Sequence, residues 1–192
     1  MSNLVPNIDL ISPCGPSLGG LAHIRLIHNL DVEFILDPIR WPTDKPYTIG
    51  PGHIKLKPNA AFADIFFHIN KANFSEPESQ SPNGSTHRQA IGIFIPQDRE
   101  DVANWYYLKQ NQKFVALYAD GNERYRLIGT PDNPASINLD SAIGSRYSDP
   151  NGYIFTISAQ SVAKAFYVED IIDDIQFPNI TLPFAFNLGF FA

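Results

Sequence analysis

Apolar and polar residues alternate in several short stretches of the chain, and this pattern predicts a mainly β protein. Alternation at residues 21–28 predicts a first strand, and residues 32–36 predict a second. Residues 38–60 contain five prolines, too many for a helix or a central strand. A long proline-rich loop with one short strand at residues 53–56 is therefore expected there.

Two apolar runs, at residues 61–69 and 89–95, flank a polar segment at residues 70–88. They predict two strands joined by a long polar loop. Because a loop of that length inside a compact domain usually has a function, Phe74 and Asn83 within it are candidate interface residues.

Residues 98–111 carry the one helical pattern of the chain. Asp98 is a natural N-cap, and Glu100 and Asp101 follow in the first turn, where the helix dipole favours negative charge. Four residues recur at spacings of three and four and therefore share one face of the predicted helix: Val102, Trp105, Tyr106 and Lys109.

The second half of the chain is predicted to consist of strands joined by turns. Residues 114–118 and 124–128 flank an Asp-Gly pair and predict a hairpin, since Asp-Gly supplies the positive φ that tight turns require. A turn expected at residues 148–152 precedes a strand at residues 153–157.

After a last strand at residues 165–168, the C-terminal segment 171–192 has strand periodicity. Six apolar residues occupy every second position: Ile180, Leu182, Phe184, Phe186, Leu188 and Phe190. Pro183 cannot donate a backbone hydrogen bond, which excludes an interior strand paired along both edges. The segment is an edge strand of its own domain or an arm that docks on a neighbouring subunit by strand addition, and both alternatives stay open.

The composition agrees with one β domain. Of the 192 residues, 18% are charged, 12% are aromatic and 16 are proline, whereas a helical bundle needs many more charges on its exposed faces. Hydrophobic residues make up 44% of the chain, enough to bury a core. We expect an antiparallel β-sandwich or barrel with one flanking helix at residues 21–170, between arms at residues 1–20 and 171–192.

The charges indicate which partners to expect. The net charge is −6, and no basic stripe is present, which argues against tight nucleic-acid binding as a main activity. The single cysteine, Cys14, cannot form an intramolecular disulfide, and the first residues lack the basic and apolar run of a secretory signal. We therefore expect a protein that is made in a cytoplasm and has no membrane partner.

No arrangement of residues indicates catalysis. Residues 15–19 match the nucleophile elbow G-x-S-x-G around Ser17, but the elbow needs a strand before the serine and a helix after it, and neither is predicted. The five histidines include no pair at the helical spacing i, i+4 and have no cysteine partners. We expect a protein that is not an enzyme and has no catalytic residue, cofactor or metal ligand.

An ordered set of features between residues 61 and 170 resembles a known family. It includes the acidic start of the helix at residues 98–101 and the hairpin at residues 114–129, and its most characteristic part is the Asp-Pro-Asn-Gly-Tyr run at residues 149–153 before a strand. In these features the chain resembles the tail tube-like and tail-completion structural proteins of bacteriophages and prophages, especially those of Bacteroidetes hosts. The resemblance covers a little over half of the chain.

The resemblance implies a tail tube-like fold whose sheets join neighbouring copies into a ring around a channel for DNA. It implies a homo-oligomer in the tail of a virion, assembled in the host cytoplasm, with other tail or neck proteins as partners and non-specific passage of DNA. The competing hypothesis is a carbohydrate- or receptor-binding β-sandwich module of a virion or cell surface. Its stacking platform would be drawn from the exposed members of one aromatic set: Trp41, Tyr47, Trp105 and Tyr106.

Overall fold

The computed structural model describes residues 19–38, 41, 44–60, 62–68, 70–82, 84–143 and 151–169. Within these residues the protein is mainly β, with antiparallel pairing throughout except between two short strands, and it has one α-helix. The predicted class, a mainly β and largely antiparallel protein with one helix, is therefore confirmed. The strands form a six-stranded, a five-stranded and a two-stranded sheet.

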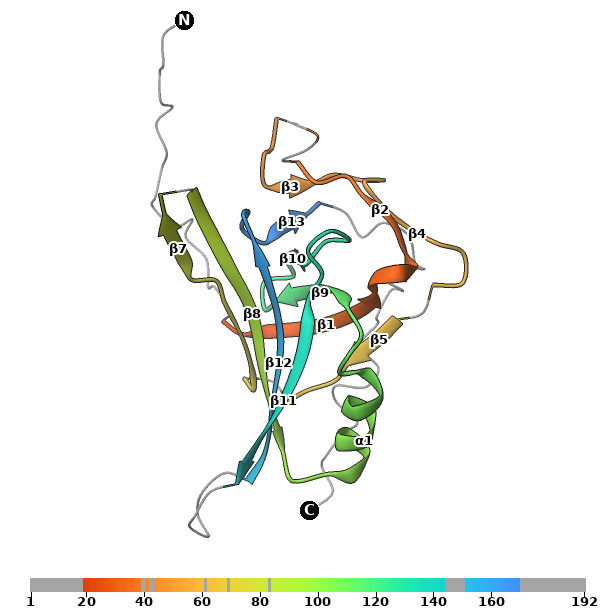
Figure 1. Ribbon diagram of the computed structural model, residues 1–192, viewed down its shortest axis with the longest axis vertical. Coiled ribbons are helices and arrows are strands. Elements are labelled where there is room, and N and C mark those ends of the chain that lie inside the picture. The colour runs from red at the N-terminus through yellow and green to blue at the C-terminus, as the bar shows by residue number, and fades with distance from the viewer. Residues whose placement is uncertain are drawn as a thin grey trace, which may run out of the picture.

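The six-stranded sheet has the order β3-β13-β10-β9-β1-β5 (Figure 1). Its strands are β1 (Leu21–His28), β3 (Thr48–Ile49), β5 (Phe62–Ile65), β9 (Phe114–Asp120), β10 (Tyr125–Ile128) and β13 (Phe166–Val168). β9 and β10 form the predicted hairpin, and β13 pairs with β3 in parallel. The sheet does not close into a barrel, because among the described residues its end strands β3 and β5 each pair with one neighbour. The barrel alternative of the prediction is therefore wrong.

The five-stranded sheet has the order β11-β12-β8-β6, and β7 also pairs with β8. Its strands are β6 (Ala72–Ser75), β7 (Glu78–Ser81), β8 (Gly84–Pro96), β11 (Ser136–Ile143) and β12 (Asn151–Ser161). Figure 1 shows β8, β12 and β11 running across the direction of β1 and β9, and their lower ends extend beyond the six-stranded sheet.

β9 lies in the middle of the fold because both of its faces are apolar. Ala116 and Tyr118 point into a hydrophobic cluster that the six-stranded and five-stranded sheets share. Val115 and Leu117 point the opposite way, into a second cluster. All four side chains are at most 2% exposed, so the six-stranded sheet must be covered on both of its faces.

The second face is covered by the proline-rich region and the strand before it. β2 (Val32–Ile35) pairs with β4 (Ile54–Leu56), and Val32 and Ile54 are buried in the second cluster together with Ile49 of β3. A 3-10 turn, Asn29–Asp31, joins β1 to β2. The short strand expected near residues 53–56 is confirmed as β4, whereas β3 was not predicted.

Helix α1 (Glu100–Lys109) confirms the predicted helix with shorter bounds. The N-cap residue of the helix is Arg99, so the prediction of Asp98 as the N-cap is wrong. The Asp98 carboxylate instead accepts a hydrogen bond from the hydroxyl of Tyr153 in β12. Trp105 and Tyr106 pack against the shared cluster, and the Trp105 ring meets the Phe155 ring edge-on at 5.9 Å between centroids. The predicted inner face of the helix therefore contacts the core.

The predicted long polar loop at residues 70–88 is wrong. That segment contains β6, β7 and the first residues of β8, and β7 pairs with β8 from Glu78–His87 to Ser81–Gly84. All four residues of β7 are exposed. A strand exposed in this way is held by backbone pairing and needs no apolar alternation, so its polar residues resemble those of a loop.

The sequence also misplaces the start of β12. This strand begins at Asn151, so Asn151 and Gly152 belong to the strand and not to the preceding turn. Gly152 is buried opposite Pro96, and a Cβ atom added to it would lie 2.1 Å from the Ile95 carbonyl oxygen. A glycine is required here because β8 and β12 approach each other closely, and not because a turn needs positive φ.

Substitution of Gly152 tests this close approach. We expect Gly152→Ala to lower the free energy of unfolding by about 1–3 kcal/mol, because the backbone of β8 has to move away from the new methyl group. The control is Gly19→Ala, since a Cβ atom there meets nothing within 4 Å; its effect should stay within about 0.5 kcal/mol. Urea denaturation measures both variants, and equal midpoints would contradict the close approach.

Candidate interaction surfaces

Phe74 is the one predicted interface residue that lies within the described part of the chain. It is half-buried in β6, and its ring lies 5.0 Å from the Tyr118 ring, measured between centroids. Its role at an interface stays a prediction. The other seven predicted interface residues lie outside the described residues: Asn83, Ile180, Leu182, Phe184, Phe186, Leu188 and Phe190.

Phe74 belongs to an aromatic–arginine cluster between the two large sheets. The Arg126 guanidinium of β10 lies 4.2 Å from the ring centroid of Tyr167 in β13 and 6.0 Å from that of Phe74, both within cation–π range. Burial raises the pKa of the Tyr118 hydroxyl, and the positive charge of Arg126 opposes that shift. The cluster connects β6 of one sheet to β9, β10 and β13 of the other.

β5 forms an open end of the six-stranded sheet. Among the described residues it pairs with β1 alone, over four residue pairs from Ile27–Phe62 to Ile24–Ile65. Ala63, Ile65 and Phe67 pack against the shared core cluster but are only partly buried. The next residue after β5, Phe66, is 75% exposed. Within the part of the chain that the structure describes, this end of the sheet therefore offers an unpaired backbone edge with apolar side chains beside it.

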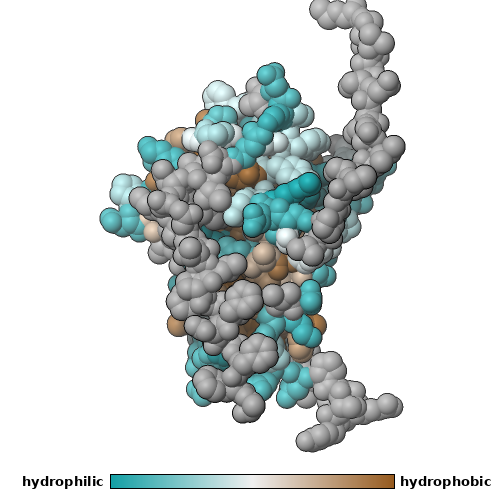
Figure 2. All heavy atoms as spheres, turned by 180° about the vertical axis from the view of Figure 1, so that it is seen from behind, coloured by the Kyte–Doolittle hydropathy of each residue, from teal (hydrophilic) through white to brown (hydrophobic). Residues whose placement is uncertain are grey.

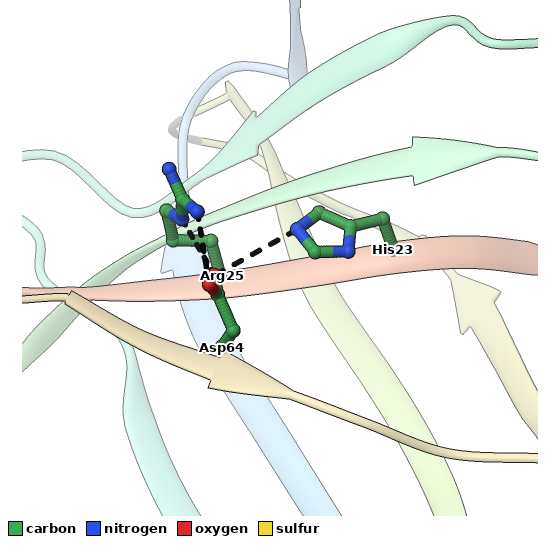
Figure 3. Close-up of polar contacts among 3 residues, drawn as sticks. All are labelled: His23, Arg25 and Asp64. Atoms are coloured by element: carbon green, nitrogen blue, oxygen red, sulfur yellow. Dashed lines mark hydrogen bonds and ion pairs between the residues drawn. The ribbon is translucent and has the colours of Figure 1, made fainter. Parts of the chain in front are cut away.

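A partly buried ion pair attaches β5 to β1 (Figure 3). Arg25 of β1 and Asp64 of β5 are cross-strand neighbours, and the guanidinium donates to both carboxylate oxygens, at 2.6 Å from Nε and 2.9 Å from Nη2. The Arg25 side chain is 1% exposed and the Asp64 side chain is 29% exposed. Bidentate geometry fixes the position of both side chains, so the pair fixes β5 in register on β1.

His23 lies beside this ion pair on the same face of β1. Its Nε2 is 3.7 Å from the nearer carboxylate oxygen of Asp64. Burial is the largest cause that lowers the pKa of His23; the Asp64 carboxylate opposes this shift and the Arg25 guanidinium adds to it. The neutral form of the imidazole is therefore favoured in the folded protein.

Arg25 and Asp64 were not among the predicted site residues, although the sequence contains a signal for their pairing. Arg25 is the one arginine or lysine in the apolar residues 21–28, and Asp64 is the one charged residue in the apolar run at 61–69. Charged residues are seldom fully buried unless they are paired. A single positive and a single negative charge in two apolar strands therefore predict neighbouring strands.

The other strand edges differ from the edge of β5. β11 pairs with β12, but the helix region also contacts β11: the Tyr106 hydroxyl donates to Asn138 at 3.4 Å, and Lys113 donates to Ser136 at 2.6 Å. β3 has only two residues, and the four residues of β7 are exposed and polar. β6 is also an end strand that pairs with β8 alone, and its Phe74 is partly buried against the core cluster. β5 has three such partly buried apolar side chains in or directly after it, Ala63, Ile65 and Phe67.

Several large apolar side chains lie at the surface. Trp41 is 60% exposed and Tyr47 is 49% exposed, both in the proline-rich region, and Tyr107 and Leu108 on α1 are 74% and 71% exposed. Figure 2 shows hydrophobic residues in the middle of the face seen from behind, with hydrophilic residues around them. The low charge of the sequence thus corresponds in part to apolar surface and not only to core.

A depression with a volume of about 570 Å³ lies between β3, β13 and the β9–β10 turn. It is lined by aromatic Tyr125 and Tyr167 and by Glu123, Arg124 and Glu169, whose charges are of both signs. In the described ranges, no three His, Cys, Asp or Glu residues lie close enough together to hold a metal ion. No described helix is long and apolar enough to cross a membrane.

No family model matches the sequence, and the comparisons with curated proteins and with solved structures gave no match.

The Arg25–Asp64 pair can be tested by removing its carboxylate. We expect Asp64→Ala to lower the free energy of unfolding by about 1–3 kcal/mol, because it removes the bidentate contact of a guanidinium whose side chain is 1% exposed. The control is Glu33→Ala, which removes the carboxylate of an exposed pair, Lys55–Glu33 at 3.0 Å, and should cost no more than about 1 kcal/mol. Similar urea midpoints for the two variants would contradict a structural role for Asp64.

The lowered pKa of His23 predicts a pH dependence of stability. The unfolded chain binds a proton near the ordinary pKa of 6.5, while the folded protein binds it only at lower pH. The stabilisation that comes from keeping His23 neutral is therefore fully present above pH 6.5, and it is lost as the pH falls from 6.5 through the folded-state pKa of His23. The free energy of unfolding, measured between pH 8 and pH 5, should fall less steeply for His23→Gln than for the parent. Parallel curves would contradict this assignment.

Proposed function

We propose that the protein is a structural protein of a phage tail or neck, which assembles into a ring around the DNA channel and contacts adjacent rings without catalysing a reaction. The observation that carries the proposal is the open end of the six-stranded sheet at β5, with its unpaired edge and its partly buried Ala63, Ile65 and Phe67. Natural proteins usually cover or disrupt such an edge. In an assembly, a strand of another copy covers it.

The arrangement of the sheets supports the same proposal. Two sheets that share one apolar cluster, with a single helix against it, are what the resemblance to tail tube-like proteins implies. We propose a β-sandwich of this type as the ring subunit. Rings form when one surface of a copy binds a different surface of the next copy, and the two ends of the six-stranded sheet, β3 and β5, are two such different surfaces.

The charge of the chain supports passage of DNA without retention. The net charge is −6, and four of these negative charges lie at the start of the C-terminal segment: Glu169, Asp170, Asp173 and Asp174. A channel wall with this balance lacks the lysine and arginine contacts from which non-specific DNA affinity arises.

A second candidate function is recognition of a carbohydrate or receptor. It is favoured by the exposure of Trp41 and Tyr47, two aromatic side chains six residues apart in the proline-rich region. Trp105 and Tyr106 do not support it, because they pack against the core cluster. This candidate predicts binding by the unassembled protein through Trp41 and Tyr47.

Imaging of the purified full-length protein tests the ring. We expect ring-shaped particles in negative-stain images and a solution mass of several chains. A variant that lacks residues 175–192 should lose most of this mass, because it lacks the alternating apolar segment. A protein that stays monomeric at high concentration would contradict the proposal. Glycan binding by that monomer, lost in Trp41→Ala and Tyr47→Ala, would favour the second candidate.

A further inference from the structure

We infer that the outer edge of β5 is the acceptor for the C-terminal segment, residues 180–190, of a neighbouring copy. The inference rests on the ring assembly proposed above and names the two surfaces that make its contact. The segment adds as a further strand beside β5 and extends the six-stranded sheet of the next copy.

The two faces of β5 differ in polarity in the same way as the even-numbered and odd-numbered residues of the segment 180–190. On one face, Ala63 and Ile65 pack at the rim of the core cluster and stay partly exposed. On the other face, Asp64 pairs with Arg25. The even-numbered residues 180–190 are all apolar and complete the rim of the core, while the odd-numbered set contains small or polar residues such as Thr181 and Asn187 that lie beside Asp64.

The single proline in the segment fits addition to one edge. In a strand, the N–H and C=O groups of one residue point to the same side, and those of the next residue point to the opposite side. Pro183 has no N–H, and it belongs to the odd-numbered set. The backbone N–H and C=O groups of the even-numbered residues can therefore all face β5. The backbone position of Pro183 that lacks an N–H faces away from β5. An added edge strand needs only this one set.

The strand order places the last described residue, Glu169, near the end of the sheet that lies opposite β5. The described chain ends just after β13, where the Glu169 N–H donates to the Ile49 carbonyl of β3. β5 lies at the other end, four strand spacings or about 19 Å away. A segment that leaves one end of a sheet and an acceptor at the opposite end join copies head to tail, which is the heterologous contact that a ring requires.

The chain after residue 169 is long enough for the segment to reach β5 of its own copy. Length alone therefore does not distinguish binding to its own β5 from binding to β5 of a neighbouring copy. The eleven residues from 169 to 180 span up to about 36 Å when extended. The covered faces of the sheet do distinguish them. Val115 and Ala116 of β9 are both fully buried, one on each face. A segment bound to its own β5 would have to pass around these packed layers, whereas one bound to a neighbour extends outward.

Disulfide trapping between two variants of the full-length chain tests the contact. In a Cys14→Ser background, one variant carries Ala63→Cys or Ile65→Cys and the other carries Leu182→Cys or Phe184→Cys. Assembled together under mild oxidation, they should give a covalent product of twice the chain mass in at least one combination, since cross-strand neighbours meet the geometry of a disulfide. Thr181→Cys is the matched control: its side chain lies on the other face, so it should give at least tenfold less product with the same partners.

Each outcome of the trapping experiment has one meaning. A third variant carries one cysteine from each set in the same chain, and a disulfide that forms only within that chain would overturn the neighbouring-copy assignment. Ring particles without any disulfide product would overturn β5 as the acceptor and leave the ring intact. The absence of both particles and product would overturn the ring and this inference together.

A pair of proline variants gives a second readout that does not depend on cysteine reactivity. Ala185→Pro removes an N–H that points away from β5, so the oligomer should persist. Leu182→Pro removes an N–H that points toward β5, so the oligomer should dissociate at a concentration at least tenfold higher than for Ala185→Pro. Leu182→Ala controls for the loss of the leucine side chain. Equal dissociation of both proline variants would contradict the proposed pairing.

Discussion

The fold depends on the burial of β9 between two apolar layers. Val115 and Leu117 face one layer, Ala116 and Tyr118 face the other, and none of these side chains contacts water appreciably. The sheet around β9 must therefore be covered on both faces, by the five-stranded sheet on one side and by β2 and β4 on the other. These layers cover the faces of the sheet but not its ends, and among the described residues β5 at one end pairs with β1 alone.

The partly buried Arg25–Asp64 pair gives this open end a defined structure. An ion pair of this kind is weak evidence for net stability, but it specifies register, because a shift of one residue would break the bidentate contact of the guanidinium with this carboxylate. The pair adds to the register that Ala63 and Ile65 set by packing against the core cluster. A defined edge is what strand addition by another copy needs, so one charge pair connects folding to the proposed assembly.

Elements with strong local signals could be predicted from the sequence. β1, the β9–β10 hairpin and α1 have clear periodicity or turn residues, and their positions are confirmed. β7 and the first part of β8 could not be predicted, because their polar residues are paired by backbone groups that no apolar alternation signals. The alternating apolar segment at residues 180–190 was also visible in the sequence. The edge that we propose as its acceptor was not, because the edge position of β5 follows from the strand order, and Arg25 and Asp64 are 39 residues apart.

Hydrogen exchange at β5 tests the central claim most directly. Backbone amides of Ala63, Asp64 and Ile65 are compared in the assembled full-length protein and in the monomer obtained by dilution. The account predicts that those amides of β5 that do not bond to β1 exchange slowly only in the assembly, while the amides of β9 are protected in both states. Equal exchange of β5 in the assembly and in the monomer would contradict the claim that this edge joins the copies.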